Sequence, residues 1–323
     1  MEFILTIDTE ADNQWDHGRD LSLENIKYIP RFQELCDKYQ IRPTYLVTSE
    51  VCLDEYSRSI FRSYLQNHRC EIGAHLHSWT TGPFRDENGL RFNDKQHAFA
   101  YELPAELLNE KIATLTSQIK DGFGVQAVSF RSGRYGFNKE VAKILVDHSY
   151  TIDSSVTPFV SWTTHKGISG LAGGPDFMDA SPKPYKYSFE NGILNELPIT
   201  ILPTAYPFSV NHALARKYIR NVQSNIILKL LKKLVFGIQP RWLRPYTRVK
   251  LAQFESLIKQ ASSLELPYLV MMFHSSELMP GGSANFPDES SIDYLYKLLE
   301  ELFIRLAQLN IPSSTLSEAG LKL

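Results

Sequence analysis

Phe3-Ile4-Leu5-Thr6-Ile7-Asp8-Thr9-Glu10, at the start of the chain, joins five apolar or β-branched residues to two carboxylates that lie one residue apart. An unbroken apolar run of this kind is typical of a strand that is buried on both faces. The end of such a strand would place Asp8 and Glu10 in a cleft. The question for the rest of the chain is whether other strand ends bring polar side chains to the same place.

Strand-like runs alternate with helical patterns along the chain. Besides the opening run, we expect strands over residues 43–48, 70–75, 127–131, 150–153, 193–202 and 268–274, with a last short one near residue 311. The apolar spacing predicts helices over about 23–39, 54–67, 104–122, 138–148 and 291–309. Residues 81–95 and 154–187 have the composition of long loops. This alternation implies right-handed crossovers and a parallel sheet, and seven or eight units favour a closed or nearly closed α/β barrel, here a single domain over residues 1–323.

Composition excludes several classes of protein. With 43% hydrophobic and 22% charged residues in 323, the chain can bury a full core. A formal net charge of -2 predicts no general attraction to nucleic acid. Three cysteines at irregular spacing favour reduced thiols, and no apolar window is long enough for a membrane span. We expect a soluble, cytoplasmic protein.

Ionisable residues collect where the expected strands end. In a parallel barrel the carboxyl ends of all strands lie on one face, where active sites are built. Core packing does not require this pattern, so it favours a functional site over structural roles for the set. The residues concerned are Asp8, Glu10, His75, His77, Arg131, Asp153 and His274.

His75 and His77 are candidate metal ligands. Residues two apart point to opposite faces of a continuing strand, so both can bind one ion only if the chain leaves the strand at Leu76. Together with an oxygen of Glu10 or Asp8, two imidazoles give three protein ligands and leave a position for water, as in hydrolytic zinc sites. The alternative is that one histidine only hydrogen-bonds to a neighbour of the site.

These stretches also resemble a known family as an ordered set. The chain is similar to the NodB-homology polysaccharide deacetylases, carbohydrate esterase family 4, and more closely to their WalW-like branch. The family's pattern matches residues 6–10, 71–77, 129–136 and 272–274, and the branch matches residues 153–158, 174–177 and 274–282. The resemblance implies a distorted (β/α)7 barrel, with N-deacetylation of an N-acetylated sugar in surface polysaccharide biosynthesis as the activity.

The resemblance also implies a role for each matching residue. Asp8 corresponds to the catalytic base, Arg131 to the arginine that orients it, and His274 to the general acid. Glu10 and His75 correspond to metal ligands, with zinc the expected ion. The backbone around Gly133 to Tyr135 would bind the oxyanion.

The chain departs from the family at the metal motif. The family places a second histidine four residues after the first, where this sequence has Trp79, so His77 is the only nearby substitute. An adjacent pair of aspartates is replaced by Asp8-Thr9-Glu10. These changes keep two alternatives open: another C–N or glycan hydrolase on the same barrel, and a non-catalytic, carbohydrate-binding member of a polysaccharide assembly complex. We expect substrate contacts from Trp79, Arg134, Tyr135, Asp153 and Trp162, with Tyr185 as a further aromatic residue for stacking on sugars.

The segment from Glu196 to Glu255 contains no acid between its ends but ten lysines and arginines. Within it, at about 211–250, an apolar stripe over residues 226–235 predicts a basic amphipathic helix. This helix could simply pack on the barrel with a solvated basic face. Alternatively, it contacts an anionic surface, either membrane phospholipid at the inner face of the membrane or the diphosphate of a lipid-linked or nucleotide-linked sugar.

Overall fold

A curled sheet forms the centre of the protein. The computed structural model describes residues 1–14, 20–84, 98–166, 173–204, 214, 217–219 and 238–323. Within them the strand order is β10-β1-β2-β3-β4-β5-β7-β6, in which only the β6–β7 pair is antiparallel, and β11 pairs with the first half of β1. Strands β8 and β9 form a separate antiparallel pair.

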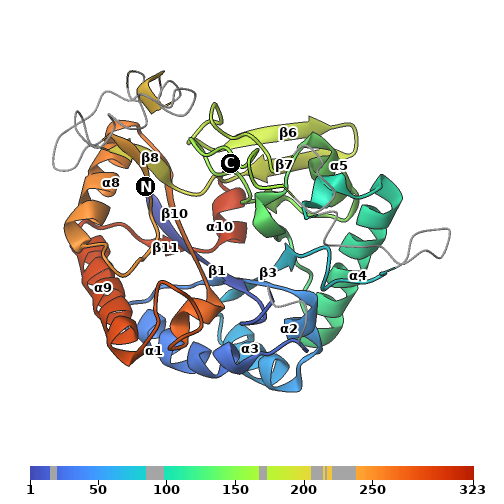
Figure 1. The fold of residues 1–323 in the computed structure, drawn as a ribbon, viewed down its shortest axis with the longest axis horizontal. Coiled ribbons are helices and arrows are strands. Elements are labelled where there is room, and N and C mark those ends of the chain that lie inside the picture. The colour runs from blue at the N-terminus through green and yellow to red at the C-terminus, as the bar shows by residue number, and fades with distance from the viewer. Residues whose placement is uncertain (15–19, 85–97, 167–172, 205–213, 215–216, 220–237) are drawn as a thin grey trace.

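Helices surround this sheet. Figure 1 shows α1, α3, α4, α8 and α9 in a ring outside the strands, with α10 inside the ring. The strands are β1 (Glu2–Thr9), β2 (Thr44–Val47), β3 (Glu71–Leu76), β4 (Ser129–Ser132), β5 (Ile152–Asp153), β6 (Tyr185–Phe189), β7 (Gly192–Glu196), β8 (Ile201–Thr204), β9 (Gln239–Trp242), β10 (Tyr268–His274) and β11 (Ser313–Ser314). The helices are α1 (Ile29–Lys38), α2 (Ser49–Leu53), α3 (Glu55–Gln66), α4 (Ala105–Phe123), α5 (Lys139–Asp147), α8 (Leu251–Ser263), α9 (Glu289–Gln308) and α10 (Leu316–Gly320). Short 3-10 helices are η1 (Glu24–Tyr28), η2 (Ala100–Glu102), η3 (Gly133–Tyr135) and η4 (Ser275–Leu278).

Thr200 brings the curled sheet close to closure. This residue lies between β7 and β8, and its backbone N–H donates to the carbonyl of Val270 on β10 at 3.0 Å. In return, the N–H of Val270 donates to the Thr200 hydroxyl at 2.8 Å. The prediction of a distorted, nearly closed α/β barrel is therefore confirmed.

Alternation along β1 sorts its side chains between two buried regions. Phe3, Leu5 and Ile7 belong to the large outer cluster under the helices. Ile4 belongs to a small inner cluster that includes Leu316 of α10. Because side chains alternate along a strand, Asp8 lies on the same face as Ile4 and therefore at the inner edge of the barrel. The apolar run thus forms a strand with two buried faces and a polar end.

Most expected strands are confirmed to within about two residues, but the one over 193–202 is wrong. The structure has two strands there, β7 and β8, which belong to different sheets. Pro198 lies between them and has no N–H to donate to a ladder, so the chain leaves one sheet and enters the other at this point. The loop expected over 154–187 ends earlier, because β6 begins at Tyr185.

Five described α-helices and strands were not predicted from the sequence, namely α2, β6, α8, β9 and α10. The expected basic helix over 226–235 lies outside the described residues, as does most of the loop over 81–95. Among the described helices, none is both long enough and apolar enough to cross a membrane.

Candidate metal centre and active site

Strand register brings the predicted residues together at the carboxyl ends of the barrel strands. Asp8 on β1 is the register partner of His274 on β10, and His75 on β3 is the partner of Arg131 on β4. All of these side chains except His274 are almost completely buried. The ends of four strands that are far apart in the sequence therefore meet at one site.

Glu10, His75 and His77 form a compact cluster of potential metal ligands. The Nε2 atom of His77 is 2.9 Å from Glu10 Oε2 and 3.1 Å from His75 Nε2, and His75 Nε2 is 3.3 Å from the same Glu10 oxygen. Ligand atoms around a tetrahedral zinc ion with bonds of about 2.0–2.1 Å are about 3.3 Å apart. One oxygen and two imidazole nitrogens at this spacing fit a small divalent ion.

Neighbouring groups fix the two imidazoles in ligand orientation. The Nδ1–H of His75 donates to the carbonyl of Arg131 at 2.9 Å, which leaves the Nε2 lone pair facing Glu10. β3 ends at Leu76, so His77 can turn to the same side as His75. His77 is held between the ring of Trp79, with centroids 4.3 Å apart, and Gly133, where a Cβ would lie only 2.7 Å from His77 Nδ1.

Burial and neighbouring charges shift the pKa values of the three cluster residues in different directions. Burial alone would raise the pKa of Glu10, but hydrogen bonds with His75 and His77 hold it well below its usual value. Burial opposes the charged form of His75, but the carboxylates of Asp8 and Glu10 raise its pKa overall. Burial lowers the pKa of His77, so its neutral, ligand form is favoured.

Asp8 lies beside the cluster but has a different partner. Arg131 Nη1 donates to Asp8 Oδ1 at 2.6 Å, while its Nε donates to the carbonyl of Ser154 at 2.7 Å. Asp8 Oδ2 remains 4.0 Å from both His75 Nε2 and His274 Nε2. Burial would raise the pKa of Asp8, but Arg131, together with His75 and His274, outweighs burial and lowers the pKa. Asp8 is therefore an ionised carboxylate held in place from behind.

Two residues that the sequence did not reveal hold the turn that carries Glu10. Asn25 Nδ2 donates to the Glu10 carbonyl and to Ser275 Oγ, both at 2.8 Å. The backbone N–H of Glu10 donates to Ser275 Oγ at 3.2 Å. Nothing in the local sequence around Asn25 indicates this contact, because its partner lies 250 residues away.

A cleft of about 630 Å³ opens over these groups. Of the expected substrate-contact residues, Arg134, Tyr135 and Trp162 line it. Arg134 and Tyr135 both have left-handed backbone angles, with φ of 54° and 61°, which cost about 1–2 kcal/mol each in a non-glycine residue. The turn after β4 therefore bears strain where it faces the cleft. Further lining residues that the sequence did not identify are Phe99, Val160, His165, Trp242, Arg244 and Tyr246.

The structure places three expected contact residues elsewhere. Trp79 packs on His77 rather than lining the cleft. Asp153 is completely buried, and both of its carboxylate oxygens accept hydrogen bonds from Ser155 at 2.8 Å. Tyr185 on β6 contacts Tyr187 and is likewise not part of the cleft wall. Position at a strand end indicated the right region for Asp153, but its side chain is used inside the fold.

His274 lies across the cleft from the histidine cluster and has two charged neighbours. Arg244 Nη2 donates to His274 Nδ1 at 2.9 Å and to Glu277 Oε2 at 3.0 Å. The Nε2 atom of His274 faces the site, 4.0 Å from Asp8 Oδ2 and from Glu10 Oε1. Burial would raise the pKa of Glu277, but other effects, of which the positive charge of Arg244 is the largest, lower it to about 2.

A buried lysine fixes the loop that follows His77. Lys111 of α4 is completely buried, and its Nζ donates to the carbonyls of Ser78, Thr81 and Pro83 at 3.0, 2.5 and 2.7 Å. These three carbonyl acceptors match the three donors of the ammonium group, which a buried charge requires. Lys111 of α4 therefore fixes the backbone that follows the candidate ligand His77.

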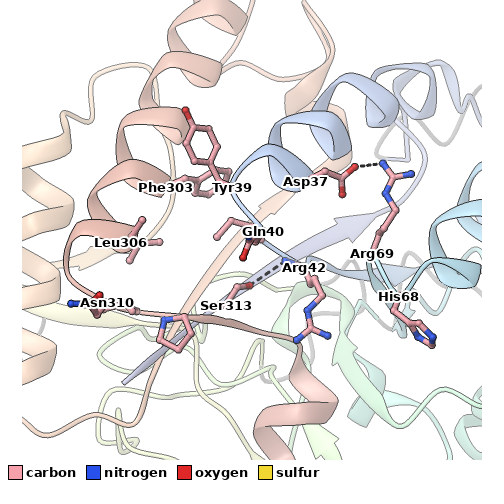
Figure 2. A pocket seen from close by; sticks show the side chains of 14 residues that line it. Asp37, Tyr39, Gln40, Arg42, His68, Arg69, Phe303, Leu306, Asn310 and Ser313 are labelled. Atoms are coloured by element: carbon pink, nitrogen blue, oxygen red, sulfur yellow. Dashed lines mark hydrogen bonds and ion pairs between the residues drawn. The ribbon is translucent and has the colours of Figure 1, made fainter.

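A larger hollow of about 940 Å³ lies at the opposite, amino-terminal ends of β2, β3 and β11 (Figure 2). Its charged side chains already have partners. Arg69 pairs with Asp37, and both Nη atoms of Arg42 pair with Glu318. In barrels of this type this end serves stability, and chemistry is built at the other end.

Comparison with known proteins supports the fold. The structure aligns over 99% of this chain and 89% of the other with a crystal structure from Mycobacterium smegmatis that is provisionally described as a polysaccharide deacetylase, with a TM-score of 0.53 and 13% identity. It also aligns over its full length with 40% of the 4-alpha-glucanotransferase of Thermococcus litoralis, with a TM-score of 0.56 and 14% identity. The fold is shared with both. No family model and no curated protein matches the sequence.

Proposed function

We propose that the protein is a divalent-metal-dependent hydrolase that removes the N-acetyl group from a sugar. The observation that carries this proposal is the buried Glu10–His75–His77 cluster beside Asp8, which is held ionised by Arg131. We also propose that the protein is a member of carbohydrate esterase family 4 and of its WalW-like branch. This membership is supported by the ordered motifs and by the shared barrel fold.

The arrangement supplies what amide hydrolysis needs. An ion bound by Glu10, His75 and His77, zinc in our proposal, would polarise the acetyl carbonyl and make water a stronger nucleophile. Asp8, 4.0 Å from the cluster, is placed to take a proton from the attacking water. Arg134, Tyr135 and His274 line the same cleft, and in our proposal the backbone around Gly133 to Tyr135 binds the oxyanion that develops on the substrate.

The geometry favours this reaction over glycoside hydrolysis. Glycosidases need one carboxylic acid that is protonated and a second carboxylate across the scissile bond. Here the pKa values of both Asp8 and Glu10 are lowered, the first by Arg131 and the second by the two histidines, against the effect of burial. Neither therefore carries a proton in the resting site, as the acid of a glycosidase must.

The substrate we propose is a surface polysaccharide precursor. The aromatic wall formed by Tyr135, Trp162 and Trp242 offers faces on which sugar rings stack, with Tyr135 and Trp162 centroids 5.1 Å apart. The sugar in our proposal is lipid-linked or nucleotide-linked. We further propose that the basic segment at about 211–250 contacts an anionic membrane on its cytoplasmic side. The absence of acids in that segment supports both parts, because a diphosphate and a membrane surface are both anionic.

Acetate release tests the activity. The purified protein is stripped with a chelator, reloaded with Zn²⁺, Ni²⁺, Co²⁺ or Fe²⁺, and incubated with N-acetylglucosamine oligosaccharides and nucleotide-linked N-acetylhexosamines. We expect acetate release that depends on the ion and is absent in His75→Ala. Carbohydrate binding without acetate release under any loading would instead favour a non-catalytic assembly protein.

A further inference from the structure

Arg244 is the cleft residue whose contacts the proposed roles leave unexplained. It follows β9, outside the parallel barrel strands, and reaches across to the end of β10. Its side chain has a relative exposure of only 12%, and it lies over the ring of Tyr246 at 5.3 Å. Burying an arginine costs desolvation free energy, which only well-placed hydrogen bonds and ion pairs can offset.

The contact with His274 determines which imidazole nitrogen carries the proton. A guanidinium has five N–H donors, no acceptor, and stays protonated in proteins. The His274 Nδ1 atom, 2.9 Å from Arg244 Nη2, must therefore be an acceptor. A neutral imidazole with a lone pair on Nδ1 carries its hydrogen on Nε2, the atom that faces Asp8 and Glu10.

Glu277 strengthens this arrangement rather than reversing it. Its Oε2 is 3.0 Å from Arg244 Nη2 but 3.5 Å from His274 Nδ1, and it also accepts the backbone N–H of His274 at 2.9 Å. Its Oε1 accepts from Asn285 Nδ2 at 3.0 Å. The carboxylate thus anchors Arg244 and the backbone of His274, and the guanidinium is the nearer of the two charged partners of Nδ1.

We infer that Arg244 is a positioning residue that fixes His274 as a neutral imidazole with its proton on Nε2. This inference rests on the proposed deacetylation and changes the role of one residue in it. A neutral imidazole can donate a hydrogen bond from Nε2 to the substrate, but it has no spare proton for the departing amine.

Asp8 then handles the proton in both steps. As the water oxygen bonds to the acetyl carbon, Asp8 takes a proton from that water. When the C–N bond breaks, the leaving nitrogen takes this proton from Asp8, which gives the free amine and acetic acid and returns Asp8 to its ionised form. His274 keeps its proton throughout and serves as a hydrogen-bond donor.

The tautomer can be measured without turnover. Protein labelled with ¹⁵N-histidine is studied by NMR, with His274 assigned by comparison with His274→Gln. We expect the shift of an unprotonated Nδ1 and a protonated Nε2 in the wild type. In Arg244→Met, which keeps the volume but removes the donors, we expect Nδ1 to become protonated toward Glu277, with kcat reduced about 10–100-fold and little change in KM.

Two further variants separate positioning from folding. Arg241→Met removes a neighbouring arginine of β9 that does not line the cleft, and it should leave the tautomer and kcat unchanged. Glu277→Gln keeps an acceptor for Arg244 and should preserve the Nε2–H form. A protonated Nδ1 in the wild type, or an unchanged tautomer in folded Arg244→Met, would overturn the assignment. A correct tautomer without acetate release from any substrate would reject the proposed deacetylation instead.

Discussion

Asp8 and Glu10 show how two carboxylates at one strand end acquire different chemistry. Asp8 faces the barrel interior and accepts a hydrogen bond from Arg131, which also donates to Ser154. Glu10 lies beyond the strand end, where Asn25 and Ser275 hold its backbone and the two histidines meet its carboxylate. The partner of each acid, rather than the acid itself, determines its role.

Substitution of each acid by its amide separates these roles. Asp8→Asn keeps the shape but removes the base, so we expect the bound metal to be retained while kcat falls by about 10²–10⁴-fold. Glu10→Gln should lose the metal. Metal content and acetate release are measured on the same samples, with the exposed Glu24→Gln as the control. Metal loss in Asp8→Asn, with Glu10→Gln still loaded, would reverse the assignment.

Only some residues of the site could be predicted from the sequence. Asp8, His75, Arg131 and His274 could be found because they end apolar strands, and parallel strand ends must meet. Arg244 could not, because it comes from a segment outside the barrel pattern whose position depends on the pairing of β8 with β9.

At the scale of elements, β5 and β7 carry a buried acid pair behind the site. Asp153 and Glu196 are register partners, and both are completely buried. Burial raises the pKa of Asp153 to about 6, and burial together with the neighbouring Asp153 raises the pKa of Glu196 well above its usual value. The folded protein therefore holds protons here that the unfolded chain releases at lower pH.

This pair should make stability depend on pH. As pH rises from about 4 through 6 and beyond, the folded state binds more protons than the unfolded state, so the free energy of unfolding falls. Glu196→Gln removes one acid, and the fall between pH 5 and pH 8 should shrink by on the order of 2 kcal/mol. Urea unfolding at both pH values measures the change. The exposed Glu190→Gln should behave like the wild type, and an equal fall in Glu196→Gln would contradict the conclusion that this pair holds the protons.

For the whole molecule, closure of the barrel depends on a short connection rather than on a strand. Thr200→Val should leave the Val270 N–H without its acceptor in a buried position, at a cost of about 1–3 kcal/mol. Thermal unfolding should show a lower midpoint than for Thr151→Val, a matched change at an exposed site. Equal midpoints would show that the contact contributes nothing to closure.

The nearly closed barrel was predictable, but the contacts that close it were not. Apolar runs such as Tyr268–His274 specify buried parallel strands by composition, and these were found in nearly correct bounds. The break at Pro198 and the small plug formed by α10 depend on contacts between distant segments, which periodicity does not report.

The short spacing of His75 and His77 has a consequence for how this protein could be altered. Both imidazoles come from one strand end, and Lys111 secures the chain at Ser78, Thr81 and Pro83. Two of the three candidate ligands therefore depend on one short stretch of backbone that a single side chain of α4 holds. A change at Lys111 would displace both imidazoles together, so affinity for an ion should be lost in one step rather than ligand by ligand.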